Sequence, residues 1–236
     1  MKILVGITGK LGSGKDYITN NIVIPAIASL NRPSGAGIAS LTQKYRYLQC
    51  AFADQLKINV MTKNYIDYKT IYEQKTPESR IFLQQEGTEN GRRLNENIWV
   101  NYLDNWMTVH NHRGIDIFVI SDVRFKNEHR YIKTQGGIIL KVLAPTRNQQ
   151  RLTTESKNCD YTYKCISTHS SECDLDDLDD SQYSMVIRND PTDDFDPYKL
   201  RKDFRQVLEK NYNLPSSSDD GQFIINTRPI DLDQVM

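Results

Sequence analysis

The chain has 236 residues, and its 30 basic and 30 acidic residues give a formal net charge of zero at pH 7. A balanced charge argues against non-specific binding of nucleic acid, because proteins that bind it carry an excess of basic residues. No apolar run approaches the roughly 20 residues that cross a bilayer, and no secretory leader is recognisable, so we expect a cytoplasmic protein without a membrane partner. The length is sufficient for one α/β domain with a full core.

The chain contains four cysteines: Cys50, Cys159, Cys165 and Cys173. They form no C-x-x-C pair, which favours reduced thiols in a cytosolic protein over disulfide bonds. A zinc site that combines the last three with His169 is the alternative.

Five apolar runs bounded by polar or turn residues predict strands at residues 2–8, 48–53, 115–121, 138–144 and 184–189. Because these runs are continuously apolar, they suit a parallel sheet that is buried on both faces. Helical spacing of apolar residues predicts helices at residues 15–30, 55–61, 78–89, 96–110, 126–134 and 198–210. Strands that alternate with helices predict a doubly wound α/β fold with a five-stranded parallel sheet and helices on both faces.

Pro25 interrupts the first predicted helix. Proline lacks a backbone donor and clashes with the preceding turn, so we expect this helix to stop near Ile24 or to kink there. At the other end of the chain, a proline, three serines and Asp-Asp-Gly follow residue 214. We therefore predict a domain over residues 1–212 and a tail over residues 213–236 with a composition typical of poorly ordered segments.

The segment Gly-Lys-Leu-Gly-Ser-Gly-Lys-Asp lies between the first predicted strand and the first predicted helix. Glycines let successive backbone N–H groups turn inward, the helix directs its positive end at an anion, and a lysine adds a cation, so the segment is suited to polyphosphate. A glycine-rich turn without a ligand is the alternative. We predict nucleotide binding by Gly9, Lys10, Leu11, Gly12, Ser13, Gly14, Lys15 and Asp16, together with Asn189 at the end of the fifth strand.

Asp16 departs from the usual pattern, which places a Ser or Thr hydroxyl on a magnesium ion at this position. A carboxylate is able to hold Mg²⁺ directly or through water. The alternative is that Asp16 only stabilises the helix N-terminus electrostatically.

Polar residues also follow the second predicted strand. Because ligands of parallel sheets collect beyond the carboxyl ends of the strands, Phe52, Asp54 and Lys57 offer an aromatic face, a carboxylate and a cation to a substrate. In the alternative interpretation Asp54 caps the following helix and Phe52 belongs to the core.

The third predicted strand is followed by Ser-Asp-Val-Arg-Phe. Asp122 occupies the position of a Walker-B carboxylate and would hold Mg²⁺ through water or act as a base, while Arg124 would neutralise the phosphate under attack. A structural ion pair of Arg124 with Asp122 or with Glu128 is the alternative.

Two glycines, Gly87 and Gly91, lie at and just beyond the end of the helix predicted at residues 78–89. Gly87 and Gly91 would let the backbone approach a ligand closely, while Arg80, Gln84 and Arg92 are suited to phosphate and to a hydrogen-bonding ring edge. The alternative is a helix C-cap followed by another cap.

Taken together, five motifs between residues 3 and 145 resemble the deoxynucleoside monophosphate kinase family of phages and large DNA viruses. They are Gly-x-x-Gly-x-Gly-Lys-Asp, Phe-Ala-Asp-x-Leu-Lys, Leu-Gln-x-x-Gly-Thr-Glu-x-Gly-Arg, Glu-Asn-x-Trp-Val and Ser-Asp-Val-Arg-Phe-x-Asn-Glu. The resemblance implies a three-layer P-loop kinase fold that moves the γ-phosphoryl group of ATP, with Mg²⁺, onto a deoxynucleoside 5′-monophosphate. The Lys-Asp ending of the loop is similar to that family's own.

The resemblance also implies roles for single residues. The catalytic residues would be Lys15, Asp16, Asp122, Arg124 and Arg147, with Asp16 and Asp122 at the metal. The substrate would be bound by Phe52, Asp54, Lys57, Arg80, Gln84, Gly87, Thr88, Glu89, Arg92, Trp99, Arg124 and Glu128. Residues 145–151 would form a lid whose arginines, Arg147 and Arg151, close over the transferring group, unless these are solvated charges on a helix.

The same residues also allow other interpretations of the protein's function. Animal-type phosphomevalonate kinase shares the Gly-Lys-Asp ending and a Ser-Asp-x-Arg strand end, and one of its segments resembles residues 171–176. Gly-Thr-Glu-x-Gly-Arg and Glu-Asn-x-Trp-Val favour the nucleotide kinases. A non-catalytic ATP-binding module is a further alternative, whereas a regulatory GTPase is disfavoured because the sequence lacks Asn-Lys-x-Asp and Asp-x-x-Gly. The partners expected are small molecules, and a homodimer is compatible with the sequence.

Overall fold

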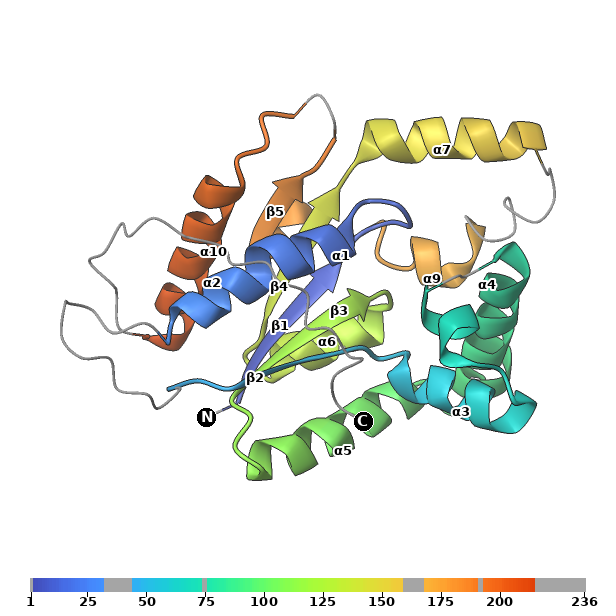
Figure 1. Ribbon diagram of the computed structural model, residues 1–236, viewed down its shortest axis with the longest axis horizontal. Helices are drawn as coiled ribbons and strands as arrows, with labels where there is room; N and C mark the ends of the chain where they lie inside the picture. The colour runs from blue at the N-terminus through green and yellow to red at the C-terminus, as the bar shows by residue number, and fades with distance from the viewer. Residues whose placement is uncertain (1, 32–43, 74–75, 159–167, 191–192, 215–236) are drawn as a thin grey trace, which may run out of the picture.

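The computed structural model describes residues 2–31, 44–73, 76–158, 168–190 and 193–214 (Figure 1). Cys159 and Cys165 of the considered zinc site, and residues 215–236 of the predicted tail, lie outside these ranges. Leu214 is buried against the core, so the ordered domain reaches at least this residue. No helix in the described part of the chain is both long enough and apolar enough to cross a membrane.

A five-stranded sheet with the order β2-β3-β1-β4-β5 forms the centre of the molecule. Its strands are β1 (Ile3–Thr8), β2 (Tyr47–Cys50), β3 (Ile117–Val123), β4 (Ile138–Leu143) and β5 (Met185–Arg188), and every pairing is parallel. Val5 of β1 pairs with Val119 on one side and with Ile138 on the other. The predicted five-stranded parallel sheet is therefore confirmed. β1 lies at its centre between β3 and β4, and the chain passes from β3 on one side of β1 to β4 on the other side. A ligand crevice is expected at such a point.

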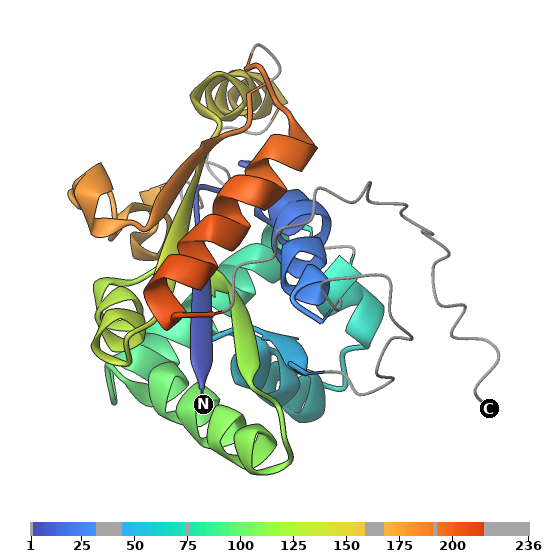
Figure 2. The same cartoon turned by 90° about the vertical axis from the view of Figure 1, so that its left-hand side faces the viewer.

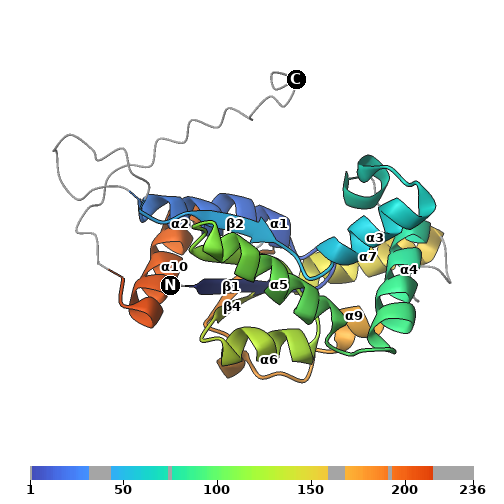
Figure 3. The same ribbon diagram turned by 90° about the horizontal axis from the view of Figure 1, so that it is seen from below.

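Helices cover both faces of the sheet, as the sequence predicts. The odd-numbered side chains of β1, such as Val5, pack against α1 (Lys15–Ile18), η1 (Thr19–Val23), α2 (Ile24–Ser29) and α10 (Pro197–Tyr212). Leu4 faces the opposite core, which is closed by α5 (Ile98–His112) and α6 (Lys126–Thr134). Figure 2 shows α10 beside α2 on one face, and Figure 3 shows α5 and α6 on the other.

The first helix does not stop at Pro25. It continues from α1 through the π-helical turns of η1 into α2. Proline leaves the carbonyl oxygen four residues earlier without its helical donor, and here that oxygen, on Asn21, accepts a hydrogen bond of 2.7 Å from Nε of Arg201. A side chain from α10 thus replaces the missing backbone donor, and the helix is able to pass the proline.

A helical lobe lies beyond the carboxyl ends of β2 and β3. It consists of α3 (Asp54–Asn64), η2 (Lys69–Glu73), α4 (Pro77–Gln84) and η3 (Gln85–Arg92), and we call it the α3–η3 lobe. The predicted alternative of a C-cap near Gly87 is wrong, because α4 continues into the π-helical η3, which contains both Gly87 and Gly91. Between this lobe and residues 9–16 lies the short helix α9 (Ser170–Cys173), and α7 (Pro145–Asn158) and η4 (Asp180–Gln182) complete the described connections (Figure 1).

Candidate active site

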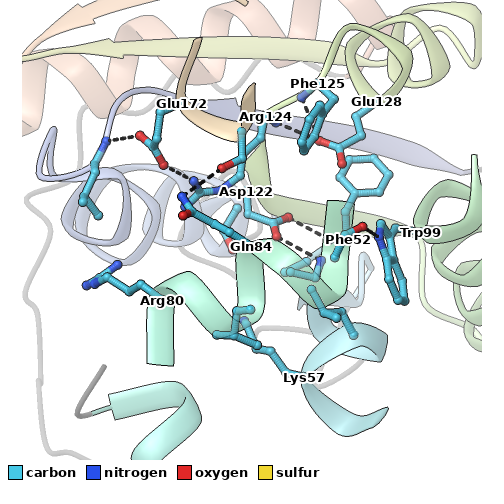
Figure 4. Close-up of a pocket in the computed structure, with 18 of the residues that line it drawn as sticks. Phe52, Lys57, Arg80, Gln84, Trp99, Asp122, Arg124, Phe125, Glu128 and Glu172 are labelled. Carbon is cyan, nitrogen blue, oxygen red and sulfur yellow. Dashed lines mark hydrogen bonds and ion pairs between the residues drawn. The ribbon is translucent and has the colours of Figure 1, made fainter. Parts of the chain in front are cut away.

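A pocket of about 450 Å³ opens between the phosphate loop (residues 9–16) and the α3–η3 lobe (Figure 4). Its volume lies within the roughly 300–1,000 Å³ that is usual for small-molecule sites. Sixteen of the predicted site residues line it: Leu11, Gly12, Gly14, Lys15, Asp16, Phe52, Lys57, Arg80, Gln84, Gly87, Thr88, Arg92, Trp99, Asp122, Arg124 and Glu128. Seven others are not among the lining residues: Gly9, Lys10, Ser13, Asp54, Glu89, Arg147 and Asn189.

Two residues that do not line the pocket, Asn189 and Arg147, hold the phosphate loop in place. Gly14 has a φ of 87°, and a Cβ atom there would lie 2.3 Å from Nδ2 of Asn189, so only glycine fits. That Nδ2 atom donates a hydrogen bond of 2.8 Å to the carbonyl oxygen of Ser13. Arg147 donates from Nη2 to the carbonyl oxygen of Asn189 at 2.5 Å. Asn189 therefore supports the loop directly and Arg147 supports Asn189, and the cofactor-binding and catalytic roles given to them stay predictions.

Lys15 folds back over the loop. Its Nζ donates to the carbonyl oxygens of Gly9 at 2.6 Å and Lys10 at 3.0 Å. Burial, together with the positive charge of Arg124, lowers the pKa of Lys15 to about 8. A cation held this way in a partly desolvated site gains from an anionic partner, which a phosphate would supply.

Asp122 connects the end of β3 to the start of the α3–η3 lobe. Its two carboxylate oxygens accept hydrogen bonds from the backbone N–H groups of Phe52 at 2.7 Å and Ala53 at 3.0 Å. Each oxygen still has a lone pair, and the side chain lines the pocket, as does the exposed Asp16.

These two carboxylates fit a magnesium ion that takes its other ligands from water and phosphate. Mg²⁺ in kinase sites is usually held by one or two carboxylates and by substrate phosphates. No cluster of three or more His, Cys, Asp or Glu side chains suited to a metal occurs among the described residues. The metal roles of Asp16 and Asp122 stay predictions.

Arg124 pairs with Glu172, which is not among the predicted site residues. Its Nη1 forms an ion pair with Oε1 of Glu172 on α9, and Oε2 of Glu172 accepts a hydrogen bond of 2.8 Å from the backbone N–H of Leu11. The alternative of an Arg124–Glu128 ion pair is wrong, because Glu128 binds the backbone N–H of Arg124, at 2.7 Å, and not its guanidinium. The sequence predicts that residues 169–172 form a loop beside the substrate or at the end of the lid, but nothing in the local pattern indicates a contact with the phosphate loop.

The carboxylate of Glu128 pairs with Arg92 instead. Arg92 donates from Nη2 to Oε1 of Glu128, and its guanidinium lies 3.7 Å above the ring of Phe125. Oε2 of Glu128 also accepts from the backbone N–H of Phe125 at 3.1 Å. Burial raises the pKa of Glu128 to about 7, although Arg92 and the two backbone amides favour its ionised form. The pair forms one wall of the pocket and joins η3 to α6.

We expect Arg92→Met to lower the free energy of unfolding by about 3–5 kcal/mol at pH 8, because it leaves a buried carboxylate unpaired. The loss should be smaller at pH 6. A carboxyl group whose pKa is raised in the folded state destabilises the fold increasingly as the pH rises toward that pKa. At pH 6, protonation of Glu128 removes most of the unpaired charge in the variant. Urea unfolding of Arg92→Met and of Arg92→Met/Glu128→Gln would measure this. The double variant should lose less than the single one, and equal losses at both pH values would contradict the interpretation.

The far end of the pocket is aromatic. Phe52 is 2% exposed and belongs to the core, as the alternative interpretation has it, and it also lines the pocket, so its role toward a substrate stays a prediction. Trp99 donates from Nε1 to the carbonyl oxygen of Gly87 at 2.8 Å. A Cβ atom on Gly91 would lie 2.6 Å from the ring of Trp99. The close approach that Gly91 permits in this structure is to Trp99, and Gly91 is not among the residues that line the pocket.

Asp54 supports the site from outside the pocket. Its carboxylate accepts hydrogen bonds from the backbone N–H of Ala51 at 2.8 Å and from the hydroxyl of Tyr72 at 3.2 Å. Lys57 lies 3.4 Å from the same carboxylate and 4.3 Å from the centre of the Tyr72 ring. The N-cap of α3 is Ala53, without a side-chain cap bond, so the alternative in which Asp54 caps this helix is wrong. Asp54 instead binds the backbone ahead of the helix and holds Lys57, and its role toward a substrate stays a prediction.

Several pocket residues were not predicted as site residues. They are Ala51, Ala53, Leu56, Leu83, Ser121, Phe125, Ser171 and Glu172. Nε2 of Gln84 lies 3.4 Å from Oγ of Ser171, so α9 also contacts the α3–η3 lobe. His169, which the zinc alternative used, accepts the backbone N–H of Ser171 at its Nδ1 and begins α9.

No protein-family model and no curated protein matches the sequence. Among solved structures, the chain is similar to an unliganded sugar kinase from Janibacter sp. HTCC2649, with 15% identity, coverage of 89% of this chain and 95% of the other, and a TM-score of 0.43. It is also similar to dephospho-CoA kinase from Campylobacter jejuni, with 12% identity, coverage of 89% and 97%, and a TM-score of 0.39. These likenesses are too distant to argue from. The functional argument therefore rests on the geometry of the pocket.

Proposed function

We propose that the protein transfers the γ-phosphoryl group of ATP to a deoxynucleoside 5′-monophosphate, in a reaction that uses Mg²⁺. The observation that carries this proposal is that one pocket contains a phosphate loop at one end and an aromatic, cationic wall at the other. Arg124 and Asp122 lie between the two ends (Figure 4). A kinase needs this arrangement, because donor and acceptor must meet in line within one site.

The donor phosphates would be held by the amides of the phosphate loop and by Lys15. Phosphoryl transfer depends mainly on positioning and on electrostatic stabilisation, so cations that surround the transferring group account for most of the catalysis. Mg²⁺ held by Asp16 and Asp122 would neutralise charge on the phosphates. Arg124 would face the transferring group, and Arg147 beside the loop would close on it as part of a lid.

The acceptor would occupy the end of the pocket beside the α3–η3 lobe. Lys57, Arg80 and Arg92 offer cations to its phosphate, while Phe52 and Trp99 offer apolar surface to its base and sugar. A monophosphate oxygen is already ionised at neutral pH, so this acceptor needs no strong general base, whereas a hydroxyl acceptor would need one. Both carboxylate oxygens of Asp122 already accept backbone hydrogen bonds, which favours a phosphate acceptor.

One observation favours a second candidate, a small-molecule phosphate kinase like phosphomevalonate kinase. Ser171 and Glu172 line the pocket, and they belong to the segment that resembles that enzyme. This candidate shares the donor site of the first and differs only in the acceptor.

A turnover assay with a panel of acceptors would identify the acceptor. Purified protein with Mg·ATP is given dTMP, dGMP, hydroxymethylated dCMP, dAMP, UMP or phosphomevalonate, and ADP and the phosphorylated product are measured. We expect ADP formation with one or more deoxynucleoside monophosphates. Turnover only with phosphomevalonate would establish the second candidate, and ATP binding without turnover of any acceptor would indicate a non-catalytic module.

A further inference from the structure

Glu172 places a buried negative charge between the phosphate loop and Arg124. Its side chain is 6% exposed. One carboxylate oxygen accepts the backbone N–H of Leu11 at 2.8 Å, and the other is paired with the guanidinium of Arg124. All three residues line the pocket, so the carboxylate lies inside the candidate active site (Figure 4).

The two donors that hold this carboxylate are the kind that bind phosphate. Inward-turned backbone N–H groups of glycine-rich loops bind phosphoryl oxygens, and guanidinium groups bind phosphate and carboxylate in the same geometry. A carboxylate and a phosphoryl group carry charge of the same sign and present similar acceptor oxygens. They compete for one position and repel each other at short distance.

The carboxylate is not needed to hold α9 against the domain. The ammonium group of Lys10 binds the backbone carbonyl oxygen of Glu172 and the carboxylate of Asp176. On the other side, the backbone N–H of Lys126 donates to Asp174 at 2.7 Å. These contacts anchor α9 without the Glu172 side chain, which can therefore leave the loop while the segment stays attached.

We propose that the Glu172 carboxylate takes the place of a phosphoryl group in the nucleotide-free protein and that a polyphosphate ligand displaces it from Leu11 and Arg124. The inference deepens the proposed function, because it rests on the phosphate loop as the site of the nucleotide's phosphates. Arg124 exchanges one anionic partner for another in this step. The guanidinium of Arg124, whose side chain is 30% exposed, is thereby paired in both states, and every polyphosphate ligand must compete with an internal anion.

The test measures polyphosphate affinity without any acceptor. Magnesium tripolyphosphate is titrated into the wild-type protein and into Glu172→Gln by calorimetry. The neutral variant lacks the competing charge, so we expect it to bind at least about tenfold more tightly. Asp177→Asn is the matched control, because it removes a carboxylate from the same segment, where Asp177 pairs with Lys126 at the surface, and its affinity should equal that of the wild type.

Glu172→Asp provides a second variant should Glu172→Gln unfold, as judged by thermal denaturation. The shorter carboxylate is unable to reach Leu11 and Arg124 together, so its affinity should lie between those of the wild type and the glutamine variant. Unchanged or weaker binding by both variants would overturn the proposal and would make Glu172 a residue that positions Arg124. The proposed function fails separately, if the wild-type protein binds tripolyphosphate but phosphorylates no acceptor.

Discussion

Lys15→Ala is expected to lower kcat/KM for phosphoryl transfer by about a thousandfold while the protein stays folded. Lys15 lies inside the phosphate loop, and a cation fixed beside the transferring phosphates stabilises charge that develops in the transition state. The fold should tolerate the change, because the Nζ of Lys15 contacts only the loop's own carbonyl oxygens, and burial of this ammonium group, which lowers its pKa to about 8, already opposes its charged form.

The measurement combines steady-state kinetics with thermal denaturation. Lys126→Ala is a suitable control, because this lysine forms an ion pair with Asp177 at the protein surface, outside the pocket. Its kinetics should match those of the wild type. If Lys15→Ala retained wild-type turnover, the loop would not hold the donor phosphates and the proposed function would be wrong.

The second large effect is expected for Arg124→Ala, which should lower kcat by about a thousandfold but weaken ATP binding by less than about tenfold. An arginine that faces the transferring phosphoryl group acts mainly in the transition state, and removal of such an arginine costs roughly 10³–10⁵ in kcat. ATP keeps its contacts with the loop amides and with Lys15 in the variant, so its affinity depends less on Arg124.

The single substitution also leaves Glu172 without its guanidinium partner, which complicates its interpretation. Arg124→Ala/Glu172→Gln removes both charges and separates the two effects. The same loss of kcat in both variants would assign it to Arg124, whereas recovery in the double variant would assign it to the unpaired carboxylate. Arg130→Ala, on the exposed side of α6, controls for loss of a positive charge and should leave kcat unchanged.

The parts of the protein that depend on contiguous residues were predictable from the sequence. The strand, the glycine-rich loop and the following helix lie within the first 23 residues, and their backbone requirements are local, since the N–H groups of the loop are its own. The five strands were predictable for a similar reason, because a continuous apolar run is the signature of a strand that is buried on both faces. Even here the local rule did not decide the outcome at Pro25, because Arg201, far away in the sequence, donates to the carbonyl oxygen of Asn21.

The rest of the candidate site depends on which strands become neighbours. Asp122 was predicted to follow a strand, but its bonds to Phe52 and Ala53 exist only because β2 pairs with β3. Glu172 lies 161 positions from Leu11 in the chain, and no periodicity or motif spacing spans such a distance.

The sequence by itself determined the architecture, the glycine-rich turn between β1 and α1 and most of the residues that line the pocket, since local backbone preferences and burial patterns depend on neighbouring residues. Only the tertiary structure decided which charges meet. It paired Arg124 with Glu172 and Arg92 with Glu128, and it brought Asn189 into contact with Ser13 of the loop and Arg147 into contact with Asn189. The physical reason is that an ion pair depends on the distance between two side chains in space, which is set by the order of the strands and by the packing of the helices upon them.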